Sequence, residues 1–144
     1  MKKNILCYVV SYKHVHNANL LFNKNEFNIT VIFEESLKII NTNKLKENNN
    51  NFYVYNKHFS IEEFLRNSNF DYIYMSTTQL RILPVKLIFN AKKIKIPTFS
   101  VQEVHQMFLH ESRVNNYMMN IDKLFVASSY EKKEYQSLGN KSEN

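Results

Sequence analysis

Three short polar segments hold the side chains that could do chemistry, and each follows an apolar run of strand-forming residues. The segments contain His14 and His16; Thr77, Thr78 and Gln79; and Gln102, Glu103 and His105. Imidazole titrates near neutral pH, so a histidine that leaves a buried strand could take a proton from a hydroxyl group. Glu103 could pair with His105 as acid and base, or orient a hydroxyl group. We interpret His14 and Glu103 as catalytic candidates and the other residues of these segments as substrate-binding candidates. The alternative is that these residues only cap helices or lie in solvated loops.

Six apolar segments must position these residues. They are Ile5–Val10, Phe27–Phe33, Phe52–Tyr55, Asp71–Ser76, Ile96–Val101 and Leu124–Ala127. Continuous runs of this kind are typical of parallel strands, which are covered on both faces. Helical patterns run from His14 to about Lys24, from the capping box at Ser60, from Leu80 to about Lys92, and from Ser129. This alternation predicts an α/β fold, a doubly wound and mainly parallel sheet with helices on both faces, in which His14 and Glu103 reach one edge.

Composition limits the classes of protein to be considered. The chain has 144 residues, 44% of them hydrophobic, and a single cysteine, so we expect one domain without an internal disulfide, in a reducing, cytoplasmic setting. The formal net charge of +6 could favour nucleic acid, an anionic membrane surface or phosphorylated substrates. The lysines are spread along the chain and no nucleic-acid motif is present, so we expect no nucleic-acid partner. No apolar run approaches the length of a membrane span.

Sequence patterns for common cofactors and metals are missing. Tyr12–His14 follows the first predicted strand, where a dinucleotide-binding fold has its glycine-rich loop, so Glu34 and Glu35 lack the context for holding a ribose. The phosphate-binding loop of NTPases is also missing. His110 and Glu111, together with the histidine of the third segment, match no standard zinc spacing. We therefore expect neither a resident cofactor nor a metal.

Three stretches, read together, resemble a known superfamily. They are ILCYVVSYKHVHNANLL, FDYIYMSTTQ, and IPTFSVQEVHQ followed by IDKLFVASSYEKKEYQSLG. The first is similar to the opening strand, turn and helix of the N-terminal, acceptor-side half of GT-B glycosyltransferases and the related sugar-nucleotide 2-epimerases. The second is similar to the third-strand motif of that half. The third is similar to its Ile-Pro strand and to its closing strand, serine, amphipathic helix and Leu-Gly.

The resemblance implies a Rossmann-like domain over residues 1–139, half of a GT-B fold, followed by a polar tail at 140–144. Such a domain would be the acceptor-binding half of a glycosyltransferase for cell-surface polysaccharide synthesis. It would be inactive without a second Rossmann-like domain or subunit, which alone would bring a nucleotide-sugar donor. The implied partners are a glycan or lipid-linked acceptor and an anionic membrane surface, at the cytoplasmic face of the inner membrane. The alternative is a non-catalytic interaction module that forms a homodimer through the surface that a second domain would cover.

Overall fold

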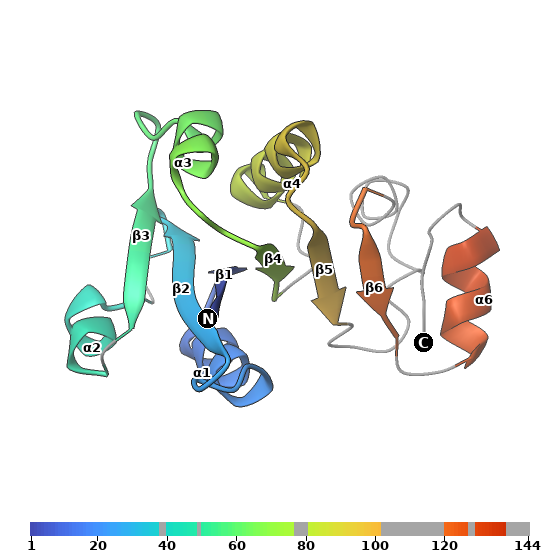
Figure 1. Ribbon diagram of the computed structural model, residues 1–144, viewed down its shortest axis with the longest axis horizontal. Coiled ribbons are helices and arrows are strands. Elements are labelled where there is room, and N and C mark those ends of the chain that lie inside the picture. The colour runs from blue at the N-terminus through green and yellow to red at the C-terminus, as the bar shows by residue number, and fades with distance from the viewer. Residues whose placement is uncertain (38–39, 49, 77–80, 102–119, 127–128, 138–144) are drawn as a thin grey trace.

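The computed structural model describes residues 1–37, 40–48, 50–76, 81–101, 120–126 and 129–137 of the chain. Strands and helices alternate along these residues (Figure 1). In chain order the elements are β1 (Lys3–Tyr8), α1 (Tyr12–Leu21), β2 (Phe27–Glu34), α2 (Thr42–Glu47), β3 (Asn51–Tyr55), α3 (Ile61–Asn67), β4 (Tyr72–Met75), α4 (Ile82–Ile94), β5 (Thr98–Val101), β6 (Lys123–Phe125) and α6 (Ser129–Ser137).

The described strands form one six-stranded sheet in the order β3-β2-β1-β4-β5-β6, and every neighbouring pair is parallel. The chain builds outward from β1 to β3, then returns beside β1 and builds outward again from β4 to β6. Strands β1 and β4 are therefore neighbours whose following helices lie on opposite faces of the sheet (Figure 1). This arrangement confirms the predicted doubly wound α/β fold.

Both faces of the sheet are covered because side chains alternate across each strand. On β1, Leu6 and Tyr8 belong to a core packed by α3 and α4, whereas Ile5 and Cys7 belong to a core packed by α1 and α2. We call these faces the α4 side and the α1 side; Figure 1 shows them above and below the sheet. Cys7 has no exposed surface, and burial raises the pKa of its thiol, so this residue packs as a small buried hydrophobe.

Local sequence signals mark the starts of α3 and α4. The hydroxyl oxygen of Ser60 accepts from the Glu63 backbone N–H at 3.3 Å, which is the first half of the predicted capping box. Pro84 lies in the first turn of α4, where its missing N–H leaves no intrahelical bond unmade. Helix α4 is followed by its C-cap Lys95, whose φ of 62° lies in the left-handed region. A glycine would take this conformation at lower cost, because lysine has a Cβ.

The element boundaries differ from the predicted ones by one to three residues in most places. Strand β1 ends at Tyr8 rather than Val10, because the chain turns there toward the N-cap of α1 at Ser11. The segment after β2, for which the sequence predicts neither a helix nor a strand, contains the short helix α2. Residues 102–119, between the fifth and sixth strands, and the polar tail at 140–144 fall outside the described residues, so the predicted domain limits stay predictions. Within the described part of the chain, no helix has the length and apolarity to cross a membrane.

Candidate functional site at the carboxyl edge of the sheet

Buried hydroxyl groups hold the carboxyl ends of the central strands together. The Ser76 hydroxyl and the Ser76 backbone N–H both donate to the carbonyl of Tyr8, where β1 ends. The Ser100 hydroxyl donates to the Met75 carbonyl at 2.6 Å, where β4 ends. Both serines are almost fully buried. These bonds satisfy backbone groups at the strand ends and fix the edge beside the β1–β4 switch point, where ligands of open α/β sheets bind.

His14 lies in the first turn of α1 and is 7% exposed. Its ring Nδ1 accepts from the Val10 backbone N–H at 3.3 Å, and its own backbone N–H donates to the hydroxyl oxygen of Ser11 at 3.4 Å. An Nδ1 that accepts a hydrogen bond leaves the proton of the neutral ring on Nε2. The ring can therefore act as a donor at Nε2. His16, two residues further along α1, is exposed.

Glu34 and Arg81 form an ion pair at the same edge. Glu34 ends β2 with its side chain only 9% exposed, and Arg81 occupies the N-cap position of α4 with its side chain 32% exposed. The Arg81 Nε donates to one carboxylate oxygen of Glu34, while the Leu83 backbone N–H donates to the other at 3.2 Å. A carboxylate is favoured at this position because it faces the positive end of the helix. The carboxylate also raises the pKa of the Arg81 guanidinium, chiefly through their hydrogen bond.

The buried hydroxyl of Tyr8 has no hydrogen-bond partner and interacts electrostatically with this ion pair. The Tyr8 side chain has no exposed surface. Burial raises the pKa of the Tyr8 hydroxyl, the charge of Glu34 raises it further, and Arg81 opposes the shift. The hydroxyl therefore stays protonated, and a buried donor left unpaired costs about 1–3 kcal/mol.

The other predicted site residues cannot be compared with the structure. Thr77, Thr78, Gln79, Gln102, Glu103 and His105 lie outside the described residues. The pairing of His14 with Glu103 accordingly stays a prediction, although the parallel strands that it requires are present. In the part of the chain that is described, no group of three or more metal-ligating side chains comes together.

Sequence reasoning missed Arg81 and Tyr8 as members of this site. Arg81 stands three residues before Pro84, so a helix start inferred from the proline would have placed it at the carboxyl edge. Its partner Glu34 was considered only for a ribose, and both of its carboxylate oxygens are instead used within the protein. Tyr8 gave no signal, because an aromatic residue inside an apolar run is read as core.

Comparison with known proteins gives a structural likeness and no sequence match. No family model matches the chain, and no curated protein matches it in sequence. The structure is similar to that of phenylacrylic acid decarboxylase from Aquifex aeolicus, with a TM-score of 0.52 and 12% sequence identity. The likeness covers 96% of this chain and 93% of that one. At this identity the likeness shows the fold and nothing finer.

The resemblance to GT-B glycosyltransferases is therefore wrong, because the structural likeness runs along nearly the whole chain to an enzyme of another class. The predicted function as the acceptor-binding half of a glycosyltransferase and the predicted role in polysaccharide synthesis are wrong for the same reason. The comparison also gives no support to the alternative, a non-catalytic interaction module. The physical reason is that strand, turn and helix recur in any doubly wound sheet, and that a proline at a strand start is tolerated in all of them. The expectations for cofactors and partners stay predictions.

Proposed function

We propose that this domain binds a small anionic metabolite at the carboxyl edge of the sheet, with Arg81 as the group that meets the anion. The observation that carries the proposal is the state of the Arg81 side chain, which a buried carboxylate orients while 32% of it stays exposed. A guanidinium has five N–H groups, more than Glu34 and the 3.5 Å contact to Ser36 use. Its planar fork suits carboxylate and phosphate groups.

Three further features support an anionic ligand at this position. The edge adjoins the switch point between β1 and β4, the general ligand-binding position of this fold. The buried Tyr8 hydroxyl is an unused donor beside the ion pair. The net charge of +6 favours the approach of anions. The structural neighbour is named for acting on a carboxylic acid, which adds support for the ligand's charge but not for a particular compound.

His14 extends the proposal from the other side of the switch point. The ring Nδ1 already accepts from the Val10 backbone N–H, so Nδ1 is not the atom that would meet the ligand. The use of His14 as a catalytic proton acceptor would first require the bond from Val10 to break.

Binding can be measured with three probes: phenylacrylate, adenosine monophosphate and inorganic phosphate. We would follow thermal unfolding together with the ring proton resonances of the five histidines, assigned by substitution. We expect at least one probe to stabilise the protein and to shift the His14 resonance while leaving that of His16 in place. Arg81→Lys keeps a cation for Glu34 but loses the fork, so affinity should fall about tenfold.

The matched control is Arg66→Lys, which changes an exposed arginine of α3 on the α4 side. It should bind as the wild type does. If no probe binds, or if Arg81→Lys binds as well as Arg66→Lys, the proposal is wrong.

A further inference from the structure

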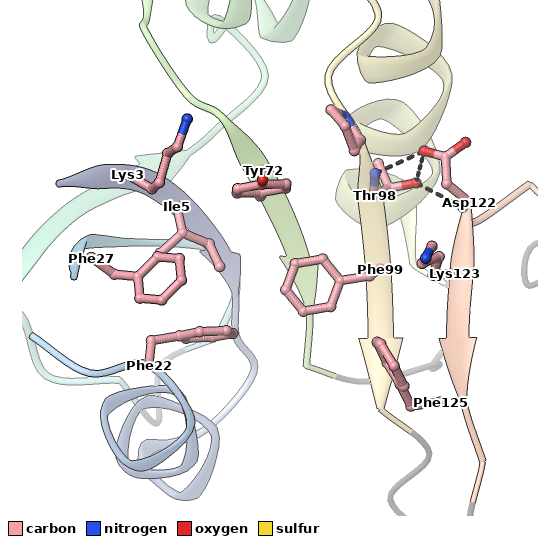
Figure 2. A pocket seen from close by; sticks show the side chains of 11 residues that line it. Lys3, Ile5, Phe22, Phe27, Tyr72, Thr98, Phe99, Asp122, Lys123 and Phe125 are labelled. Carbon is pink, nitrogen blue, oxygen red and sulfur yellow. Dashed lines mark hydrogen bonds between the residues drawn. The ribbon is translucent and has the colours of Figure 1, made fainter. Parts of the chain in front are cut away.

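The two faces of the sheet differ in how their polar groups are used. On the α1 side, a hollow of about 520 Å³ is walled mainly by the rings of phenylalanine and tyrosine residues (Figure 2). At its rim the backbone N–H and the hydroxyl of Thr98 both donate to the Asp122 carboxylate, at 2.8 and 2.9 Å, and the Lys3 ammonium donates to Asp71 at 3.4 Å. These rim groups are used within the protein and indicate no ligand. The α4 side, by contrast, contains a buried donor that is not used.

That donor is the hydroxyl of Tyr8, the last residue of β1. Its side chain has no exposed surface, and within the described part of the chain the hydroxyl has no hydrogen-bond partner. A ligand at the carboxyl edge therefore cannot reach the hydroxyl without opening the core. Phenylalanine would fill the same space without the cost of an unpaired buried donor. The hydroxyl thus has to be explained by another group inside the protein.

The group that the geometry brings to Tyr8 is the Glu34 carboxylate. Tyr8 is the register partner of Ile32, and Glu34 stands two residues further along β2, a step of about 7 Å that these long side chains can span. Ile32 and Tyr8 both belong to the core on the α4 side, and residues two apart on a strand point to the same face. Leu83 packs in that core, and its backbone N–H donates to Glu34. The charge of Glu34 also raises the pKa of the Tyr8 hydroxyl, so the two groups interact.

The two oxygens of the Glu34 carboxylate have separate partners. Oε1 accepts from the Leu83 N–H at 3.2 Å and so caps α4, whose N-cap residue Arg81 makes no side-chain cap hydrogen bond. Oε2 accepts from the Arg81 Nε. If the guanidinium turns toward an anion in solvent, Oε1 keeps its donor and Oε2 loses its own. The Glu34 side chain is only 9% exposed, so water cannot fully replace that donor.

We infer that the Tyr8 hydroxyl is the alternative donor for Glu34, and that it bonds the carboxylate when Arg81 moves to its ligand. Tyr8 is then a positioning residue of the site, and this use of it rests on the proposed function, because the anion is what draws Arg81 away. The Glu34 carboxylate has two donors in both states, Leu83 with Arg81 or Leu83 with Tyr8. A hydroxyl bonded to a carboxylate is one of the stronger hydrogen bonds in proteins, so the exchange lowers the cost of moving the guanidinium.

The test measures urea unfolding midpoints and needs no ligand. In the wild type, Tyr8→Phe should leave the midpoint unchanged or raise it, because it removes an unpaired donor. In Arg81→Met the same substitution should lower the midpoint, because the hydroxyl then bonds Glu34. Arg81→Met by itself remains less stable than the wild type, since a neutral hydroxyl replaces a charged fork. Adding Glu34→Leu to Arg81→Met removes the carboxylate, and Tyr8→Phe should again leave the midpoint unchanged or raise it.

The matched control is Tyr74→Phe, which changes a buried tyrosine of β4, 3% exposed, in the core on the α1 side. It should shift the midpoint equally in the wild type and in Arg81→Met. If Arg81→Met does not fold, Arg81→Gln replaces it, and a smaller change of the same sign is expected because the amide keeps one neutral donor. The inference is overturned if Tyr8→Phe acts in the same direction in both backgrounds, or if Tyr74→Phe also reverses its effect.

A second measurement concerns the ligand. For any probe that stabilises the wild type, Tyr8→Phe should weaken binding about tenfold, because Arg81 then leaves Glu34 without a replacement donor. An unchanged affinity would overturn the inference, since Tyr8 would not assist the movement of Arg81. If no probe binds the wild type, the proposed function is wrong, and the unfolding midpoints still decide whether Tyr8 serves Glu34.

Discussion

The Glu34–Arg81 pair allows one structural claim to be tested quantitatively. Arg81→Met removes the guanidinium and leaves the Glu34 carboxylate, 9% exposed, with the Leu83 N–H as its remaining partner. Removing one partner of a buried pair costs about 3–5 kcal/mol. Because 32% of the Arg81 side chain is exposed, we expect a loss near the lower end, about 3 kcal/mol of unfolding free energy.

Glu34→Gln gives the second edge of a double-mutant cycle. The amide oxygen can still accept from Leu83, but the charge that holds Arg81 is gone, so we expect a loss of about 1–2 kcal/mol. In the double variant neither charge is left unpaired. Its loss should therefore be smaller than the sum of the two single losses by about 2 kcal/mol.

The assay is urea unfolding at neutral pH followed by far-ultraviolet circular dichroism, since the chain has no tryptophan. The exposed pair of Glu62 and Arg66, 3.0 Å apart, serves as the control cycle and should show a coupling of no more than about 0.5 kcal/mol. If the Glu34 and Arg81 losses add to within about 0.5 kcal/mol, the two side chains do not depend on each other. Glu34 would then not be the group that orients the guanidinium at the carboxyl edge.

Two further predictions concern α4 and the start of β1. Lys95→Gly should raise the unfolding free energy by about 1 kcal/mol, because φ is 62° at this position. Lys92→Gly, inside the helix, should lower the unfolding free energy by about 1 kcal/mol. Urea unfolding midpoints measure both changes, and a change in the same direction in both variants would contradict the conformational argument. The Asn4 N–H, and secondly Lys3, hold the pKa of Asp71 below its ordinary value of 3.8, so its stabilisation is present above that pH and lost as the pH falls below it. Thermal midpoints should therefore fall less on acidification in Asp71→Asn than in the wild type, and parallel pH profiles would refute this.

The sequence was sufficient for the fold because burial on both faces leaves a direct trace in composition. The run Ile5–Val10 is continuously apolar because alternate side chains enter opposite cores, and the same holds for the end of β2. Strand ends were harder to place. Val9 and Val10 look like strand residues by type, but the chain leaves the sheet there to reach the cap at Ser11. A local pattern cannot show which apolar residue is the last to pair.

The candidate site was less accessible because its contacts join distant parts of the chain. Arg81 and Glu34 are 47 residues apart, and no spacing rule connects them. They meet because β2 and β4 flank β1 in the sheet, so an acid at the end of β2 can reach the start of the helix after β4. The histidine in the turn after β1 could be found from sequence, because that turn lies at the carboxyl edge in any fold of this type. The tautomer of His14 could not be predicted from the sequence, since it depends on the hydrogen bond that Nδ1 accepts from the Val10 backbone N–H.

The mistaken family resemblance has a physical explanation of the same kind. The matching stretches are strand starts, turns and helix caps, and the geometry of a parallel sheet requires such residues whatever ligand is bound. Pro97, for example, precedes β5 because a residue without an N–H is tolerated at a strand start, and its carbonyl still accepts from Ile73 at 3.0 Å. Evidence for a family must instead come from side chains that the fold does not require. The guanidinium of Arg81 and the unpaired hydroxyl of Tyr8 are of this kind. Apolar residues in place of Glu34 and Arg81 together would leave no buried charge unpaired, and Tyr8→Phe would remove an unsatisfied buried donor.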